Sequence, residues 1–300
     1  MTDTAIHTEG LTKHYGDVEA LNDLDLVVGM GEVFGFLGPN GAGKTTMIRT
    51  ILDLIRPTRG KASILGFDSH ADAVEIRNHV GYLPSDLAMY PRLTGGDTLR
   101  YFANLRGGVD WPYVEELAER LGADLSTKVG DYSSGNRQKV GLIQAFMHRP
   151  RLLIMDEPST GLDPLVQREF QHMLRELVAE GRTVFLSSHT LSEVQRVADR
   201  VGVIRLGRLV EVSAVDALRS RAIRHVELAY TAPVDVAAFA RVEGVADPFA
   251  ENNHVRMSFD GSMADLLRVA AQQGELVDIA TQEADLEEIF LSYYDGSEQH

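Results

Sequence analysis

Nine residues from Gly38 to Thr46, with the sequence GPNGAGKTT, follow an apolar run and precede a helical pattern. This is the setting in which the spacing G-x4-G-K-[ST] forms a phosphate-binding loop. Its glycines let backbone N–H groups surround an anion, and the helix start adds a positive dipole end. Lys44 can reach the β- and γ-phosphates, and the Thr45 hydroxyl can bind Mg²⁺. We therefore predict a nucleoside triphosphate site formed by Gly38, Pro39, Asn40, Gly41, Ala42, Gly43, Lys44, Thr45 and Thr46.

Two adjacent carboxylates end a second apolar run, LLIMDEP, which extends from Leu152 to Pro158. In enzymes with a phosphate loop, the Asp at the end of such a strand holds Mg²⁺, which would be the role of Asp156. Glu157 could then activate a water for in-line attack on the γ-phosphorus. An acidic pair after a strand is also typical of a helix cap or a solvated loop. The glycine-rich loop about 110 residues upstream favours the catalytic interpretation.

A histidine, His189, follows a third apolar run, TVFLSS. A histidine at the end of a strand is often a structural hydrogen-bonding residue. In the same sheet as the two carboxylates, however, a neutral imidazole could orient the attacking water and the carboxylate. We therefore predict Glu157 and His189 as the catalytic pair.

The segments that must position these residues alternate between strand and helix patterns. Helical patterns extend from about residue 44 to 55 and after Asp163, where Leu165, Phe170 and Leu174 begin an apolar face. Such alternation predicts an α/β fold with a mainly parallel sheet. The region from about 86 to 145 is mostly helical and is expected to form a separate lobe. The predicted strands are Glu32–Gly38, Val80–Pro84, Arg151–Pro158, Thr183–His189 and Arg200–Gly207.

The last part of the chain differs in pattern and in charge. Residues 216–300 contain 16 acidic and 6 basic residues, against 28 and 23 in residues 1–215. The stretches RHVELAY and HVRMSF alternate like strands, and SMADLLRVAAQQG reads as a helix. We predict a first domain over 1–215 and a small α+β accessory domain over 216–300.

Composition excludes several classes of protein. The chain has 300 residues, a net charge of −15 and no cysteine. The charge argues against nucleic acid as a partner, and disulfides or thiolate metal sites are impossible. Without a run of about 18 apolar residues or a secretory signal, we expect a cytoplasmic protein.

The motifs in this order resemble the ATP-binding cassette family over about residues 5 to 215. Between the glycine loop and the acidic strand, YSSGN (Tyr132–Asn136) stands where that family has a signature of the type LSGGQ. Ser133 and Gly135 match, whereas Tyr132, Ser134 and Asn136 depart from the commonest letters. The resemblance implies that Ser133, Gly135 and Asn136 bind the γ-phosphate of ATP held by a partner cassette. A second copy or a homologue would then complete the sites.

Other positions are carried over from the same resemblance. Tyr15 resembles the aromatic residue that stacks on adenine, although a tyrosine in a turn or core would look the same. Asp163, in STGLD, resembles the loop that communicates across the dimer and also suits a helix N-cap. Ser85 stands where the family usually has a Gln that contacts Mg²⁺ or water. Because Ser is too short to do this identically, its metal role and the rate of hydrolysis are open.

The C-terminal stretch ADLEEIFLSYY (284–294) resembles the extension of type-2 exporter ATPases, with Leu286, Ile289 and Phe290 expected in packing. The resemblance implies a subunit that uses Mg-ATP to close a dimer and drive export through a separate transmembrane permease. The chain would then lie on the inner face of the cell membrane. The alternatives are a soluble, non-transport cassette ATPase and a nucleotide-gated regulatory module with little turnover.

Overall fold

The computed structural model describes residues 4–221 and 224–282 and divides the chain into two compact units, Met1–Val215 and Asp216–His300. Each unit is described by itself. The predicted packing of Leu286, Ile289 and Phe290 lies outside the described residues.

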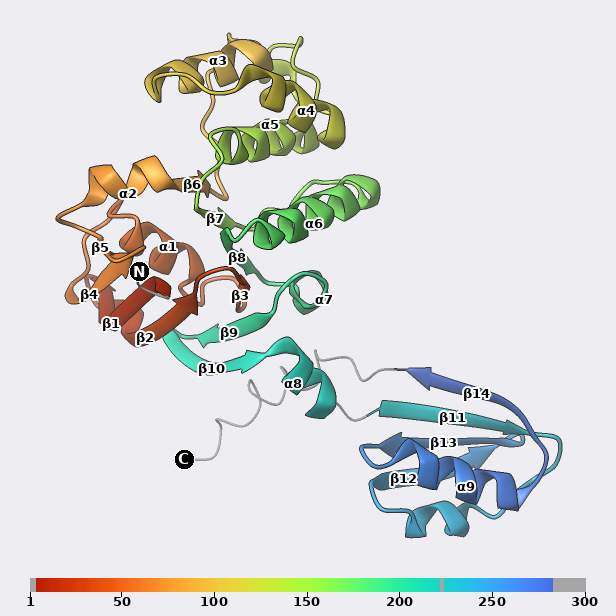
Figure 1. Ribbon diagram of the computed structural model, residues 1–300. Helices are drawn as coiled ribbons and strands as arrows, with labels where there is room; N and C mark the ends of the chain where they lie inside the picture. The colour runs from red at the N-terminus through yellow and green to blue at the C-terminus, as the bar shows by residue number, and fades with distance from the viewer. Residues whose placement is uncertain (1–3, 222–223, 283–300) are drawn as a thin grey trace. The chain divides into compact units, whose positions relative to one another are not determined.

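A six-stranded sheet forms the centre of the first unit (Figure 1). Its strand order is β10-β9-β3-β8-β7-β6; the five strands from β9 to β6 are parallel, and β10 is antiparallel to β9. The strands β3, β7 and β8 are buried along their whole length, as their continuous apolar runs predict. This arrangement confirms the predicted α/β fold. The strand bounds are β3 Val33–Leu37, β6 Val80–Leu83, β7 Leu152–Asp156, β8 Thr183–Ser188, β9 Arg200–Arg205 and β10 Arg208–Ala214.

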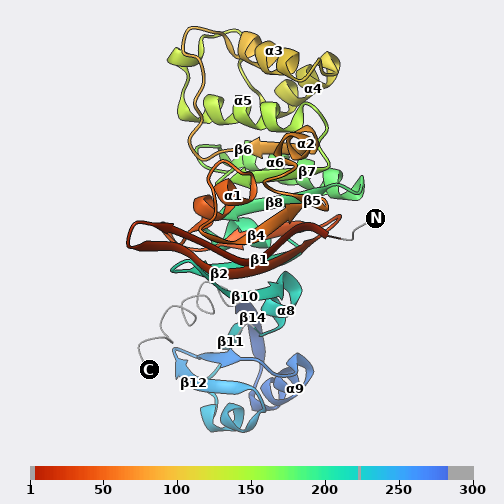
Figure 2. The ribbon, with the colours of Figure 1, turned by 90° about the vertical axis from the view of Figure 1, so that its left-hand side faces the viewer.

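A second, antiparallel sheet has the order β2-β1-β4-β5 and shares a core with the central sheet (Figure 2). The helix α1 (Lys44–Ile51) contributes Met47, Ile48 and Ile51 to this core. It is shorter than the predicted 44–55, because Asp53 turns the chain with φ 54°. We did not predict this sheet. Its strands are β1 Thr4–Tyr15, β2 Val18–Gly29, β4 Arg59–Ile64 and β5 Phe67–Asp68.

Helices cover the other parts of the first unit. Both views show α3 (Gly95–Leu105), α4 (Trp111–Leu121) and α5 (Ser134–Phe146) grouped as a lobe beyond β6 (Figures 1 and 2). The lobe is joined to α6 (Pro164–Ala179) by Arg120, whose side chain reaches Glu169 at 2.6 Å and Glu176 at 2.7 Å. The remaining helices of this unit are α2 Ala73–His79, the 3₁₀ turn Val129–Asp131 and α7 Leu191–Gln195.

The predicted apolar face of α6 needs one correction. Phe170, Leu174 and Leu177 are buried, but Leu165 is 76% exposed. Leu165 lies in the first turn of the helix, directly after the N-cap Asp163 and Pro164. The helix therefore meets the sheet only from its second turn onward.

The second unit contains a four-stranded antiparallel sheet of order β12-β13-β11-β14. Inward side chains such as Val226, Leu228 and Val255 form a core with Phe239 and with Leu266 of α9. Its elements are α8 Val215–Arg221 at the boundary, β11 Arg224–Tyr230, the 3₁₀ turn Val236–Arg241, β12 Val245–Glu251, β13 His254–Phe259, α9 Met263–Gln273 and β14 Leu276–Gln282. Among the described residues of both units, no helix is long and apolar enough to cross a membrane.

Candidate active site

The phosphate loop, Gly38–Thr46, connects the end of β3 to the start of α1. Gly43 has φ 112°, and a Cβ there would lie 2.5 Å from the carbonyl oxygen of Ala20 on β2. Position 43 therefore requires glycine on both conformational and steric grounds. Gly41, with φ 81°, has open space where its Cβ would be. The loop thus leaves room on its exposed side for an anion.

Lys44 holds its ammonium group inside this loop. Its Nζ donates hydrogen bonds to the carbonyl oxygens of Gly38 at 2.6 Å and Pro39 at 3.2 Å. The same Nζ lies 3.3 Å from Oε1 of Glu157. The predicted phosphate-binding cation and the predicted catalytic carboxylate are therefore in direct contact.

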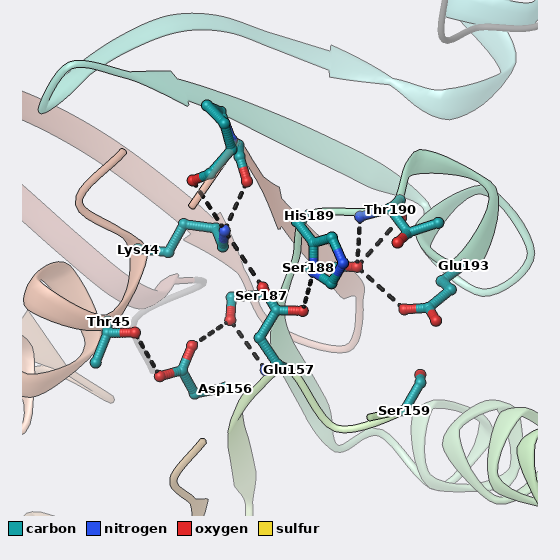
Figure 3. A network of polar contacts seen from close by, with 12 residues as sticks. Lys44, Thr45, Asp156, Glu157, Ser159, Ser187, Ser188, His189, Thr190 and Glu193 are labelled. Carbon is teal, nitrogen blue, oxygen red and sulfur yellow. Dashed lines mark hydrogen bonds and ion pairs between the residues drawn. The ribbon is translucent and has the colours of Figure 1, made fainter. Parts of the chain in front are cut away.

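Asp156 is fully buried at the end of β7, with both carboxylate oxygens engaged (Figure 3). The Thr45 hydroxyl donates to Oδ2 at 2.7 Å, and the Ser187 hydroxyl donates to Oδ1 at 2.5 Å. Ser187 also accepts a hydrogen bond from the backbone N–H of Glu157 at 3.2 Å. Ser187 therefore links the two acidic residues. We did not predict it; the visible signal was a hydroxyl at the end of a buried strand that pairs with β7.

Glu157 lies between Lys44 and His189. Its Oε2 is 2.8 Å from Nδ1 of His189, while its buried Oε1 accepts no hydrogen bond from the described residues. The backbone of Glu157 has φ 54°, in the left-handed region that a side chain other than glycine seldom adopts. This conformation, together with the paired strands β7 and β8, places the predicted catalytic pair side by side.

A network at the end of β8 holds the segment that carries His189 (Figure 3). The Ser188 hydroxyl donates to Glu193 at 3.1 Å and accepts from the backbone N–H of Thr190 at 2.9 Å. His189 itself is half exposed. Its ring is thus anchored on the Glu157 side and accessible on the other.

The donor set at Thr45 and Asp156 fits Mg²⁺. A hydroxyl and a carboxylate are hard oxygen ligands, and they already meet at 2.7 Å. Mg²⁺ is usually bound by one or two protein groups and completed by water and phosphate oxygens. The described residues contain no cluster of three or more His, Cys, Asp or Glu side chains that could hold a metal ion.

The signature turn, Tyr132–Asn136, lies in the helical lobe at the start of α5. The Ser133 hydroxyl caps the helix by accepting from the Asn136 N–H at 3.2 Å. A Cβ on Gly135 would lie 2.7 Å from the carbonyl oxygen of Gly161. Both polar side-chain atoms of Asn136 bind the backbone of Asp124, at 2.8 and 3.0 Å. The predicted phosphate role of Asn136 therefore competes with contacts inside its own lobe.

Gln138 lies one turn after Ser134, the first residue of α5, and connects this helix to the segment that follows Glu157. Its buried amide donates to the carbonyl oxygen of Pro158 at 2.8 Å. Within the residues that the structure describes, no hydrogen bond joins the signature turn to the phosphate loop. The signature helix is instead connected to the backbone of Glu157 and Pro158, whose carbonyl oxygens accept from the Gln138 amide at 3.5 and 2.8 Å.

Tyr15 and Ser85 lie outside the polar network. Tyr15 ends β1, is 49% exposed, and has Lys13 Nζ 5.0 Å from its ring centroid. The adjacent strand β2 approaches the phosphate loop at Ala20, next to Gly43. Ser85 is exposed just after β6, and no hydrogen bond joins it to Thr45 or Asp156 in the described part of the chain. Its predicted metal role has no geometric support.

The comparisons with known proteins agree with this geometry. Residues 21–160 match the family model described as ABC transporter. The chain is 35% identical, over 97% of its length and 96% of the relative, to the bacitracin transport ATP-binding protein BcrA of Enterococcus faecalis. It is 39% identical to the daunorubicin resistance ATP-binding protein DrrA3 of Streptomyces coeruleorubidus, over 73% of this chain and 71% of that protein.

A solved structure of an ATP-binding subunit of an ABC transporter is also similar. It superimposes with a TM-score of 0.66 at 33% identity and covers 73% of this chain and 93% of that one. The chain belongs to the ATP-binding proteins of the ABC transporter family.

Proposed function

We propose that this protein hydrolyses ATP and couples Mg-ATP-driven dimer closure to export through a separate transmembrane subunit. The observation that carries the proposal is the position of Glu157, 3.3 Å from Lys44 and 2.8 Å from His189. A carboxylate placed between the phosphate-binding cation and an imidazole is suited to take a proton from a water at the γ-phosphate. Residues 1–215 would form the ATP-binding domain and 216–300 an accessory domain.

Each polar residue of the site has a distinct part in this reaction. Lys44 and the N–H groups of the phosphate loop would bind the β- and γ-phosphates. Thr45 and Asp156 would hold Mg²⁺, which supplies neutralising charge for the phosphate oxygens. Glu157 would accept the proton of the attacking water, and His189 would orient that carboxylate. Tyr15 would stack on the adenine.

The signature turn supports a dimeric site. Ser133 and Gly135 lie in the lobe and share no hydrogen bond with their own phosphate loop within the described residues. The N-terminus of α5, with the hydroxyl of Ser133, suits a γ-phosphate presented by another protomer. A second copy or a homologous subunit would supply that nucleotide.

A groove on the first unit supports the permease partner. It has a volume of about 280 Å³ and no carboxylate among its described lining residues, which are Leu52, Leu54, Arg77, Val80, Tyr82, Arg106 and Gln144. Desolvation lowers the pKa of Arg106, which has no ion pair within the described residues. Two guanidinium groups beside apolar side chains suit an acidic partner, so we infer a permease segment that carries apolar and acidic side chains. This contact would hold the protein at the cytoplasmic face of the membrane.

The catalytic proposal is tested by Glu157→Gln. This change preserves shape but removes the proton acceptor, so phosphate release should fall by about 10²- to 10⁴-fold. Binding of Mg-ATP should remain, and the ATP-bound variant should accumulate as a dimer in size-exclusion chromatography. Wild-type phosphate release no faster than that of the variant would reject the hydrolytic proposal.

The partner proposal is tested by Arg106→Glu, with the exposed Arg59→Glu on β4 as the matched control. Each tagged variant is used for pull-down from detergent-solubilised membranes of the source organism. Loss of a captured multi-span protein with Arg106→Glu, but not with Arg59→Glu, is the expected result. Equal capture by both would place the permease contact elsewhere.

A second candidate is a nucleotide-gated regulatory module that binds ATP with little turnover. The observation that favours it is the exposed Ser85, which has no hydrogen bond to the metal ligands within the described residues. In that case the wild type would dimerise with ATP as Glu157→Gln does, without measurable phosphate release.

A further inference from the structure

The turn that begins at Asp124 contacts Tyr132 and Asn136, two of the three residues of the signature turn that depart from the commonest family letters. Oδ1 of Asn136 accepts from the Asp124 backbone N–H at 2.8 Å, and Nδ2 of Asn136 donates to the Asp124 carbonyl oxygen at 3.0 Å. The hydroxyl of Tyr132 donates to the same carbonyl oxygen. Tyr132 and Asn136 thus both bind the backbone of Asp124, which lies eight and twelve positions upstream of them.

This segment is itself well anchored. The Asp124 carboxylate accepts from the N–H and the hydroxyl of Ser126, at 2.8 and 2.7 Å. The carbonyl oxygen of Leu125 accepts from the N–H of Gly96 at 2.9 Å, which joins the turn to the start of α3. Asn136 and Tyr132 therefore attach the signature turn to a fixed part of the lobe.

The attachment sets the geometry of the predicted phosphate ligands. Asn136 lies in the first turn of α5, where its N–H is capped by Ser133. On the opposite side, Gly135 is in close contact with Gly161. A shift of Asn136 would therefore change where the Ser133 hydroxyl and the Gly135 N–H point.

We infer that Asn136, assisted by Tyr132, is a positioning residue that clamps the signature turn to the backbone of Asp124 instead of binding the nucleotide. The inference rests on the proposed function, because it concerns the part of the protein that would bind the partner's ATP. It differs from the expectation that Asn136 binds the γ-phosphate of ATP held by a partner cassette.

The two roles make opposite predictions for Asn136→Gln. A nucleotide ligand should tolerate the change, since Gln is the commonest family letter and carries the same amide. A clamp should not, because the extra methylene misplaces both hydrogen-bonding atoms relative to Asp124. We expect Asn136→Gln and Asn136→Ala both to raise the KM for ATP by about 5- to 30-fold, as the loss of one to two kcal/mol implies, with a smaller change in kcat.

Hydrogen exchange of the full chain provides a readout that does not depend on hydrolysis. Without nucleotide, the Asp124 amide should exchange about 5-fold faster in Asn136→Gln and Asn136→Ala, because it loses its acceptor. The matched control is Asn78→Ala on α2, whose amide donates to Glu75 at 3.3 Å, and it should change neither exchange at Asp124 nor KM. Tyr132→Phe keeps the ring and removes one donor to the same carbonyl, so its effect should be less than additive with Asn136→Ala.

Two results would overturn the clamp. One is unchanged exchange at Asp124 in all Asn136 variants; the other is Asn136→Gln with wild-type KM and activity. Should an Asn136 variant not fold, Tyr132→Phe alone must still accelerate the exchange of Asn136 and its neighbours. Absence of ATP hydrolysis by the wild type would reject the proposed function, whereas accelerated exchange at Asp124 would still support the clamp.

Discussion

The imidazole of His189 lies 2.8 Å from the carboxylate of Glu157, measured from Nδ1 to Oε2. The two residues directly follow neighbouring parallel strands. Glu157 also contacts Lys44, and the backbone next to His189 is held by the hydrogen bond from the Thr190 N–H to the Ser188 hydroxyl. The contact therefore depends on the register of β7 and β8, in which Asp156 is opposite Ser187. A substitution at the end of β7 or of β8 should therefore also change the position of the polar residues at the end of the other strand.

His189→Ala is expected to lower the rate of phosphate release by about 10²-fold, because Glu157 loses the group that orients it. Stability should change little, since the ring is half exposed. The control is His172→Ala on α6, where another exposed histidine lies 3.4 Å from Glu176. Steady-state ATPase assays with equal loss in both variants would contradict a specific role for His189.

Ser187→Ala should reduce both stability and activity. The buried Asp156 carboxylate would lose a charge-assisted hydrogen bond, which costs about 1.5–3 kcal/mol of unfolding free energy. Ser69→Ala is the control, because the Ser69 hydroxyl is buried without a hydrogen bond in the described residues and its removal should be nearly neutral. Urea unfolding followed by circular dichroism measures the difference. Equal free energies of unfolding for the two variants would show that the Ser187 contact contributes little.

Tyr15→Ala should weaken ATP binding by about 3- to 10-fold, as expected for the loss of one ring-stacking contact. Tyr15→Phe keeps the aromatic face and should bind ATP like the wild type. Isothermal titration calorimetry with Glu157→Gln as the parent avoids turnover during the measurement. A similar loss with Tyr15→Phe would assign the contribution to the hydroxyl instead of the ring.

His148 should make stability depend on pH. Desolvation, with the nearby charge of Arg106, lowers the pKa of His148 from 6.5 to about 4. Below pH 6.5 the unfolded state therefore binds a proton that the folded state does not, and stability decreases until about pH 4. Between pH 7 and 5 this amounts to about 1–2 kcal/mol.

His148→Gln should remove that part of the pH dependence, because the amide can still donate to the Val80 carbonyl oxygen that His148 contacts at 3.1 Å. His172→Gln, at an exposed position, is the control. The measurement is the unfolding free energy of the first unit at both pH values. An unchanged difference between pH 7 and 5 in His148→Gln would contradict the assignment.

The parallel strands were predictable because they are short apolar runs, and two of them, β7 and β8, lead into polar residues. Asp156 and His189 could be found in this way, since the ends of parallel strands meet at one edge of the sheet. The antiparallel sheet was missed because β1 and β2 pair through several register shifts, which interrupt the alternation of polar and apolar residues. The spacing of polar and apolar residues along the sequence does not predict where such bulges occur.

The polar partners of the site were harder to predict than the site itself. The sequence shows Ser187 only as a hydroxyl near the end of an apolar run, and its role depends on the pairing of β8 with β7. The contacts of Asn136 depend on a turn twelve residues upstream. In both cases the sequence shows residue types, whereas the function of the side chain is decided by tertiary packing.

The bond from Gln138 to the Pro158 carbonyl oxygen has a consequence for the timing of turnover in a dimer. In the proposed dimer, this bond would join the signature turn, which would bind the partner's ATP, to the backbone that follows the proposed proton acceptor Glu157. Through this contact, a change at one nucleotide would be transmitted to the other. The two sites of such a dimer would therefore hydrolyse ATP in a coordinated way, and inactivating one site should slow hydrolysis at the other.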